Sequence, residues 1–305
     1  MRFPWARSAA ALGCGALLTL GCGGSDVQPE MPSPSVVDQS ADDLGLPQAT
    51  AEESSGGAAE SSEPTSEAPA EESEGPLGPV RVVVGESTPL EGASPSLRIL
   101  APRNGQRVTT GNVSLRLQLR GWELEPDPGR HVHVIVDNEP YIAVRDLSAP
   151  IDLNELVQRN LGHELAEGTH VVRVFPSRAH HESVKSAGAF ATVTFHYRQP
   201  TEGFAFDARA PLLTFSRPKG CNAAGQRVLL DFFVSNAALA ADGTQVRYEL
   251  DGTTGTITQW LPHWIEGLRA GQHTLRLTLV GADGAPLAGP FNDTTRTFTV
   301  APSCS

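Results

Sequence analysis

The fold is decided by two stretches: His-Val-His-Val-Ile-Val-Asp at residues 131–137 and Gln-Val-Arg-Tyr-Glu-Leu-Asp at residues 245–251. In both, apolar side chains recur at every second position and an Asp ends the run, which is typical of a strand that enters a turn. The segments around them recur in the same order, so the chain contains an internal repeat.

Each copy of the repeat consists of short, mostly alternating segments bounded by Gly, Pro, Asn or Asp. These segments lie at residues 97–102, 113–119, 131–137, 165–170 and 190–195 in the first copy, and at residues 212–215, 228–234, 245–251, 268–273 and 295–300 in the second. Several short strands within about 100 residues predict an antiparallel β-sandwich. We therefore expect an all-β protein with two tandem immunoglobulin-like sandwiches, at residues 96–198 and 204–305, and a helical turn or two at residues 151–161.

Residues 1–21 have the layout of a bacterial export signal. Arg2 and Arg7 precede an apolar run that is too short to span a bilayer. Cys22 follows Gly21 directly, which resembles the lipobox of bacterial lipoproteins, although Thr19 stands where that family prefers Leu. The resemblance implies a diacylated Cys22 as the mature N-terminus and only membrane anchor. The alternative is an ordinary secretory signal with an incidental Cys.

The next segment, residues 22–95, is rich in Ser, Glu, Pro, Ala and Gly. It contains 13 acidic residues and no Lys or Arg between residues 23 and 80, so most of the net charge of −12 belongs to it. Such a composition cannot bury enough apolar surface to offset the entropy of ordering, which predicts a disordered acidic tether. Residues 81–84 read as a short strand of undefined register. The remainder is nearly neutral, which argues against a nucleic-acid partner.

Two cysteines remain beyond the signal and the lipid site. Cys221 follows the first strand of the second copy and Cys304 follows its last strand. The first and last strands of such sandwiches commonly run parallel, which places both cysteines at one end. An even pair in an oxidising compartment therefore predicts a disulfide.

The histidines separate into two kinds when the copies are compared. His170 and His273 both occur in Leu-x-x-Gly-x-His before a strand, which favours an inward, structural role. His131 and His133 instead alternate with valines, so we expect them to point outward, with Cβ atoms about 6–7 Å apart. Together with His181 and Glu182, from the loop after the neighbouring strand, they form a candidate copper or zinc site. The alternative is a set of solvent-facing polar residues or a neutral hydrogen-bonding network.

Three segments resemble parts of an uncharacterised two-unit envelope protein family of cyanobacteria and other bacteria: residues 137–141, 177–185 and 211–220. The similarity covers roughly residues 97–300. The family pattern has a His-x-His like that at residues 131–133, and Trp-His-Glu-Ser-Phe-Lys where this chain has His-His-Glu-Ser-Val-Lys. His181, Glu182 and Lys185 therefore match the pattern, and His180 replaces an aromatic residue. Since the family has no assigned activity, the resemblance implies an architecture and a candidate site but no reaction.

No motif of a known enzyme class stands out in the sequence. There is no Gly-x-Ser-x-Gly elbow, no phosphate-binding Gly-Lys-Thr loop and no His-Glu-x-x-His. Trp260 and Trp264 are candidates for an aromatic glycan or peptide platform, but such residues more often close the end of a sandwich core.

The sequence thus predicts a non-enzymatic, lipid-anchored envelope protein that uses two sandwiches for binding or scaffolding. Because Gly23 is not the Asp that retains lipoproteins at an inner membrane, we expect the outer membrane, facing the periplasm or the cell surface. The partners are the membrane, through Cys22, and an envelope protein or glycan. No cofactor is expected in this interpretation. The alternatives are a periplasmic copper or zinc binder and a glycan- or peptide-binding module.

Overall fold

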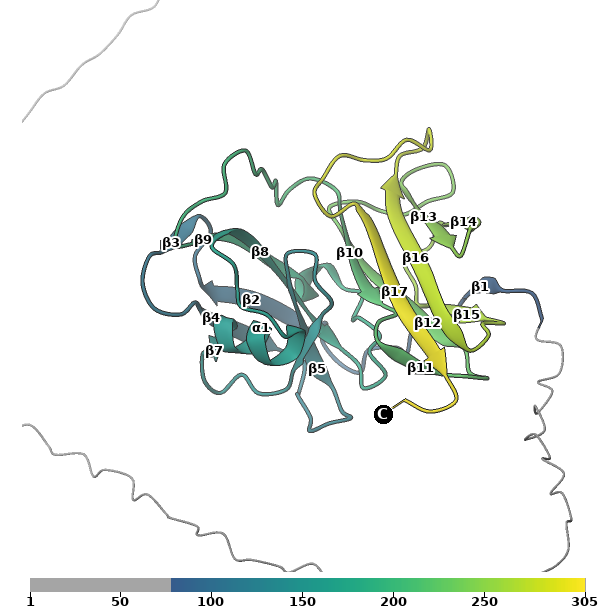
Figure 1. Ribbon diagram of the computed structural model, residues 1–305, viewed down its shortest axis with the longest axis horizontal. Helices are drawn as coiled ribbons and strands as arrows, with labels where there is room; N and C mark the ends of the chain where they lie inside the picture. Colours follow the sequence, from purple (N-terminus) through teal and green to yellow (C-terminus); the bar gives the residue numbers. More distant parts are fainter. Residues whose placement is uncertain (1–77, 305) are drawn as a thin grey trace, which may run out of the picture. The chain divides into compact units, whose positions relative to one another are not determined.

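The computed structural model describes residues 78–304, all within one compact unit, Pro69–Ser305. The export signal, Cys22 and residues 22–77 of the predicted tether lie outside the described residues. The described chain is mostly β-strand and folds into two sandwiches, as predicted (Figure 1). No helix in the described part of the chain is long and apolar enough to cross a membrane.

The first sandwich consists of two sheets that face each other across one core. The smaller sheet has the strand order β2-β4-β7 and the larger has the order β3-β9-β8-β5-β6. The strands are β2 (Ser96–Ala101), β3 (Gln106–Val108), β4 (Ser114–Arg120), β5 (His131–Val136), β6 (Ile142–Val144), β7 (Ile151–Asp152), β8 (Gly168–Ser177) and β9 (Ala191–Tyr197). All neighbours are antiparallel except β3 and β9, which run parallel.

The second sandwich repeats this arrangement strand for strand. Its sheets have the orders β10-β12-β15, extended by β1, and β11-β17-β16-β13-β14. The strands are β10 (Leu212–Arg217), β11 (Cys221–Ala223), β12 (Val228–Ser235), β13 (Gln245–Leu250), β14 (Thr253–Ile257), β15 (His263–Glu266), β16 (Gly271–Val280) and β17 (Asp293–Ala301). In Figure 1, β16, β17 and β11 lie side by side, and β11 pairs parallel with β17. In both copies the last strand thus pairs parallel with the short strand that follows the first one, whereas the first strands, β2 and β10, pair in the opposite sheet.

Alternation along the strands builds one apolar core in each sandwich. In β5, Val132, Val134 and Val136 are buried in the first core, together with Leu115 and Phe195. The second core has the same composition, with large aliphatic and aromatic side chains from the corresponding strands. Removing this apolar surface from water stabilises the fold by about 25 cal/mol for each Å².

A repeated Asp–His pair closes the same corner of both sandwiches. Asp137, with φ 51°, accepts a hydrogen bond from the backbone N–H of Val171 and contacts Nδ1 of His170 at 2.7 Å. Asp251, with φ 48°, does the same for His273, at 2.6 Å. His170 is 5% exposed and its Nε2 donates to a turn carbonyl. The inward, structural role predicted for these histidines thus agrees with their contacts.

The one α-helix in the described residues is α1 (Leu153–Leu161), at the place predicted for helical turns. Asp152 begins it by accepting hydrogen bonds from the backbone N–H groups of Asn154 and Glu155. Gly162 ends it in the left-handed conformation, at φ 80°. A single 3-10 turn, η1 (Ala187–Ala189), precedes β9.

The predicted extent of the tether, to residue 95, is wrong at its end. Residues 81–84 form β1 (Arg81–Val84), which pairs antiparallel with β15 of the second sandwich. Val82 packs against the second core, which gives the strand an apolar anchor. The chain therefore contacts the second sandwich before it enters the first at β2.

Candidate metal centre

His131 and His133 occupy consecutive outward positions on β5, and both are fully buried. The valines between them face the core of their own sandwich, so the two imidazoles point away from that core, as predicted. The alternative, that these two histidines face solvent, is wrong. β10 of the second sandwich covers this face, and the hydroxyl of Ser216 lies 3.2 Å from Nδ1 of His133.

His181 reaches the same point from the loop after β8. The loop turns sharply, because Arg178 and Glu182 are joined by a backbone hydrogen bond and His181 has φ 69°. Its Nδ1 lies 3.0 Å from Nε2 of His131, which lies 3.0 Å from Nε2 of His133. All three nitrogen atoms are within 4.8 Å of one another. The structure thus brings together three histidines that the sequence singled out.

The hydrogen bond at the outer side of His131 fixes which of its ring nitrogens faces inward without a proton. Nδ1 of His131 is 2.9 Å from the carbonyl of Gly129, which only accepts, so Nδ1 carries the proton and Nε2 is bare. Metal–nitrogen bonds of about 2.0–2.1 Å place neighbouring ligand nitrogens about 3–3.4 Å apart. The two separations of 3.0 Å match this range, and all three ligand nitrogens lie within 4.8 Å of one another.

Aromatic rings enclose the cluster on one side. Tyr141 stacks on His133 with ring centroids 3.6 Å apart and an interplanar angle of 11°. Phe175 approaches His133 edge-on at 5.3 Å. Tyr141 is 1% exposed, and burial raises the pKa of its hydroxyl to about 12. These contacts hold the His133 ring in one orientation.

The surroundings keep the three imidazoles uncharged. Burial lowers the pKa of His181 to about 3, and the Arg217 charge acts in the same direction. Burial also lowers the pKa of His131, and it lowers that of His133 well below the ordinary value. Neutral imidazole is the form that binds a metal.

Glu182, predicted as a fourth ligand, has other partners. Its carboxylate is 2.9 Å from Nε2 of His180, 3.6 Å from Nε of Arg178 and hydrogen-bonded to the hydroxyl of Ser87. It is not among the three groups whose ligand atoms meet. Burial opposes its charge, yet these hydrogen bonds lower its pKa. Glu182 is therefore not a ligand as predicted. It is adjacent to His181 in the loop, but its side chain contacts His180, Arg178 and Ser87 instead of the cluster.

Sequence reasoning missed the residues that surround the cluster. Tyr141, Arg145, Arg217 and Lys219 come from three separate turns and strand ends. Three of them, Tyr141, Arg217 and Lys219, lie in segments noted for their family resemblance, but neither segment suggested a role. Pairing of β6 with β5 places Tyr141 and Arg145 beside the cluster, and the packing of the second sandwich adds Arg217 and Lys219 from the end of β10.

The loop that carries His181 is fastened to the second sandwich. Nζ of Lys185 contacts Oδ1 of Asp231, on β12, at 2.5 Å, and the Ser183 hydroxyl donates to the same carboxylate at 3.0 Å. Asp231 is fully buried. An ion pair between the sandwiches therefore positions the loop, four residues after His181.

The predicted disulfide is present between Cys221 and Cys304, whose Cα atoms are 5.6 Å apart. Cys221 begins β11 and Cys304 follows β17, its parallel partner. The bridge therefore fixes the last strand of the second sandwich. It lies outside the histidine cluster.

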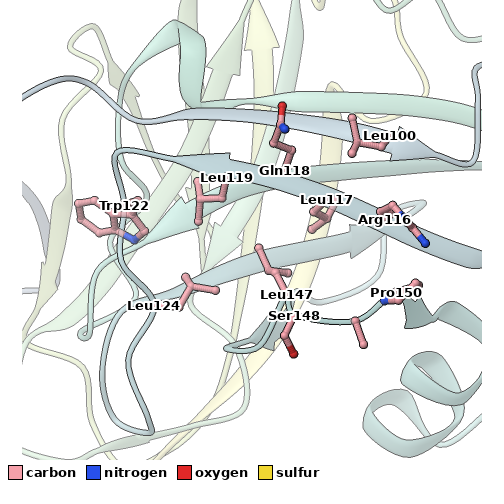
Figure 2. Close-up of a pocket in the computed structure, with 11 residues that line it drawn as sticks. Leu100, Arg116, Leu117, Gln118, Leu119, Trp122, Leu124, Leu147, Ser148 and Pro150 are labelled. Atoms are coloured by element: carbon pink, nitrogen blue, oxygen red, sulfur yellow. The ribbon is translucent and has the colours of Figure 1, made fainter.

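A groove of about 500 Å³ follows the later half of β4, where β7 no longer pairs with it. Figure 2 shows Leu119, Leu124 and Leu147 grouped between Trp122 at one end and Arg116 at the other. The two tryptophans considered from the sequence lie elsewhere. Trp260 packs edge-on against Phe233 at 4.8 Å, and Trp264 is stacked by Arg227 at 4.1 Å. These contacts agree with the structural role favoured for them.

Comparisons with known proteins identify no family. No protein-family model and no curated protein matches the chain. Among solved structures, fibronectin(III)-like modules of Clostridium thermocellum CbhA are 12% identical, with a TM-score of 0.24, over 67% of this chain and 93% of that one. A Bacteroides ovatus SGBP-B, solved with a mixed-linkage heptasaccharide, is 15% identical, with a TM-score of 0.20, over 68% and 47%. Scores this low carry no argument about function.

Proposed function

We propose that the chain is a non-enzymatic, lipid-anchored protein of the bacterial cell envelope that binds one zinc or copper ion through His131, His133 and His181. The observation that carries this proposal is the convergence of three imidazole nitrogens, two of them on fully buried rings. Of the functions considered from the sequence, metal binding is the one with a defined geometry.

The donor set indicates which metals fit. It contains imidazole nitrogens alone, and this ligand type suits zinc and copper, whereas calcium and magnesium require oxygen ligands. Second contacts from Gly129 and Ser216 orient two of the rings, as outer hydrogen bonds do at metal-binding histidines. Ring orientation is therefore set before a metal arrives.

Burial favours storage, sensing or structural use of the metal over catalysis. His131 and His133 are fully buried, with Ser216 of the second sandwich against His133, so a substrate of more than a few atoms has no direct route to them. Catalysis requires a site where substrate, metal and activated groups meet. A metal ion bound at this site would link two side chains of β5 to His181 of the loop after β8, on the face of β5 that β10 covers.

The first prediction is that the metal-stripped full-length chain, in detergent, binds one zinc or copper ion that depends on these histidines. Calorimetry should show one site in the wild type. His181→Asn should weaken it by more than about 100-fold, because loss of a ligand costs at least as much as loss of an outer contact. Asn is chosen because it tolerates the left-handed backbone conformation of His181. His131→Ala/His133→Ala should abolish the site.

The matched control is His163→Ala, which removes an exposed histidine that only contacts a neighbouring carbonyl. It should bind the metal like the wild type. All variants keep the acidic segment 22–77, so weak metal binding to its carboxylates is the same in every comparison. Since burial lowers the pKa of all three rings, affinity should fall far less from pH 7.5 to 5.5 than the roughly thousandfold loss expected of three ordinary imidazoles. Equal binding by His181→Asn and wild type contradicts the proposal.

The second prediction concerns the anchor. Cys22→Ser should release the protein from membranes or leave an uncleaved precursor, because only a Cys can be diacylated at this position. Membrane fractionation and mass spectrometry of the mature N-terminus measure the two outcomes. A wild-type protein that fractionates as soluble, with no lipid on its N-terminus, would show that the lipoprotein hypothesis is wrong.

A further inference from the structure

Positive charge surrounds the histidine cluster. Arg217 and Lys219 lie 5.6 and 3.9 Å from the centroid of the Tyr141 ring, which stacks on His133, and Arg145 follows β6, the strand paired with β5. One carboxylate, that of Asp127, is paired with Arg145. A second carboxylate near Tyr141, that of Asp231, is balanced by Lys185. The three cations against Asp127 therefore leave an excess of two positive charges beside the cluster, before any metal ion is counted. A divalent cation that enters alone is therefore repelled.

The same neighbours hold buried donors that have no acceptor among the described residues. Nε of Arg145 and Nε of Arg217 are buried and make no hydrogen bond. The Tyr141 hydroxyl is buried as well, and since the neighbouring Arg217 guanidinium can only donate to it, its own proton has no acceptor. The Tyr141 side chain is 1% exposed and lies against both His133 and His181, with ring centroids 3.6 and 5.6 Å apart. Buried donors without a partner are rare in folded proteins and cost free energy. Their grouping at one place indicates a missing acceptor.

The metal itself leaves room for that acceptor. Three imidazoles fill three positions of a tetrahedral ion, and the fourth is commonly taken by water or another small ligand. The imidazoles bring no negative charge to offset the ion. A negative fourth ligand would reduce the repulsion from the surrounding cations and would accept hydrogen bonds from their side chains.

We propose that the metal binds together with a small inorganic anion, which takes the fourth coordination position and is held by Arg217 and the Tyr141 hydroxyl. This inference rests on the proposed metal site and names its second ligand. Because His131 and His133 are fully buried and only His181 is partly exposed, the anion is of the size of azide or bicarbonate. Lys219, whose Nζ donates to the Tyr141 carbonyl at 2.8 Å, holds Tyr141 in place.

The test uses the metal-stripped full-length chain in detergent, with cobalt(II) as a spectroscopic probe and perchlorate as the only other anion. Adding azide, and separately bicarbonate, should change the visible spectrum of bound cobalt with saturation at one anion per metal. Cobalt affinity should rise at least tenfold at saturating azide, since coupling between two ligands is reciprocal.

Arg217→Ala should act in opposite directions on the two ligands. It should weaken azide binding at least tenfold, while cobalt affinity without azide stays equal or rises, because one repelling charge is gone. Arg98→Ala, at an exposed arginine of β2, is the matched control and should change neither. Cobalt that binds equally well with and without azide, with no spectral change, overturns the anion but leaves the metal site. Cobalt binding that is equal in wild type and His181→Asn overturns the metal site itself.

Discussion

Lys185→Met should lower the free energy of unfolding by about 3–5 kcal/mol, the cost of leaving one member of a buried ion pair without its partner. Asp231 is fully buried and the Lys185 side chain is 6% exposed, so no solvent replaces the lost ammonium. Methionine keeps most of the volume and the apolar stem, which limits the effect to the charge. Urea unfolding followed by circular dichroism measures the change.

Two controls separate the buried charge from other effects of the substitution. Arg276→Met breaks the exposed pair with Asp293 and should cost less than about 1 kcal/mol. Lys185→Met combined with Asp231→Asn should recover much of the loss, because the neutral amide keeps an acceptor for Ser183. A loss below about 1 kcal/mol for Lys185→Met alone would contradict this role of the pair.

Removing the disulfide should destabilise the second sandwich by about 2–4 kcal/mol, the usual value for a bridge that closes a long loop. The bridge joins residues 83 positions apart, and it fixes the end of β17 beside β11. In Cys221→Ser/Cys304→Ser, hydrogen exchange should accelerate most in peptides of β11 and β17. Peptides of β8 and β9, in the first sandwich, are the internal control.

Metal binding offers a second control on the disulfide variant. The histidine cluster involves β5, the β8 loop and the adjoining end of β10, so the variant should still bind zinc. Equal acceleration of exchange in both sandwiches would mean that the bridge stabilises the whole unit. Unchanged exchange in β11 and β17 would contradict the prediction outright.

The sandwich architecture and the disulfide followed from the sequence because both depend on local patterns. Alternation assigns each strand residue to one of two faces, and the repeat allows one copy to be checked against the other. The expectation that first and last strands run parallel then placed Cys221 and Cys304 at one end, where β11, the short strand after β10, pairs with β17. The helical turns expected at residues 151–161 are present as α1, which begins after Asp152 and ends at Gly162.

Alternation could not reveal what covers a face. It set His131 and His133 outside their own core, but their burial depends on β10 and Ser216, which belong to the other sandwich. The same limit explains β1, whose partner β15 lies far along the chain, so that no local pattern defines its register. Sequence neighbours also need not share a site. Glu182 follows His181 directly, but its carboxylate contacts His180 and not the cluster.

X-ray absorption at the zinc edge of the loaded, full-length protein tests the central claim most directly. If His131, His133 and His181 bind the metal, the spectrum should contain three imidazoles with nitrogens at about 2.0–2.1 Å. In His181→Asn one imidazole should be lost from the shell. A shell built from oxygen ligands with no imidazole scattering, or the same spectrum in wild type and His181→Asn, would contradict the metal site.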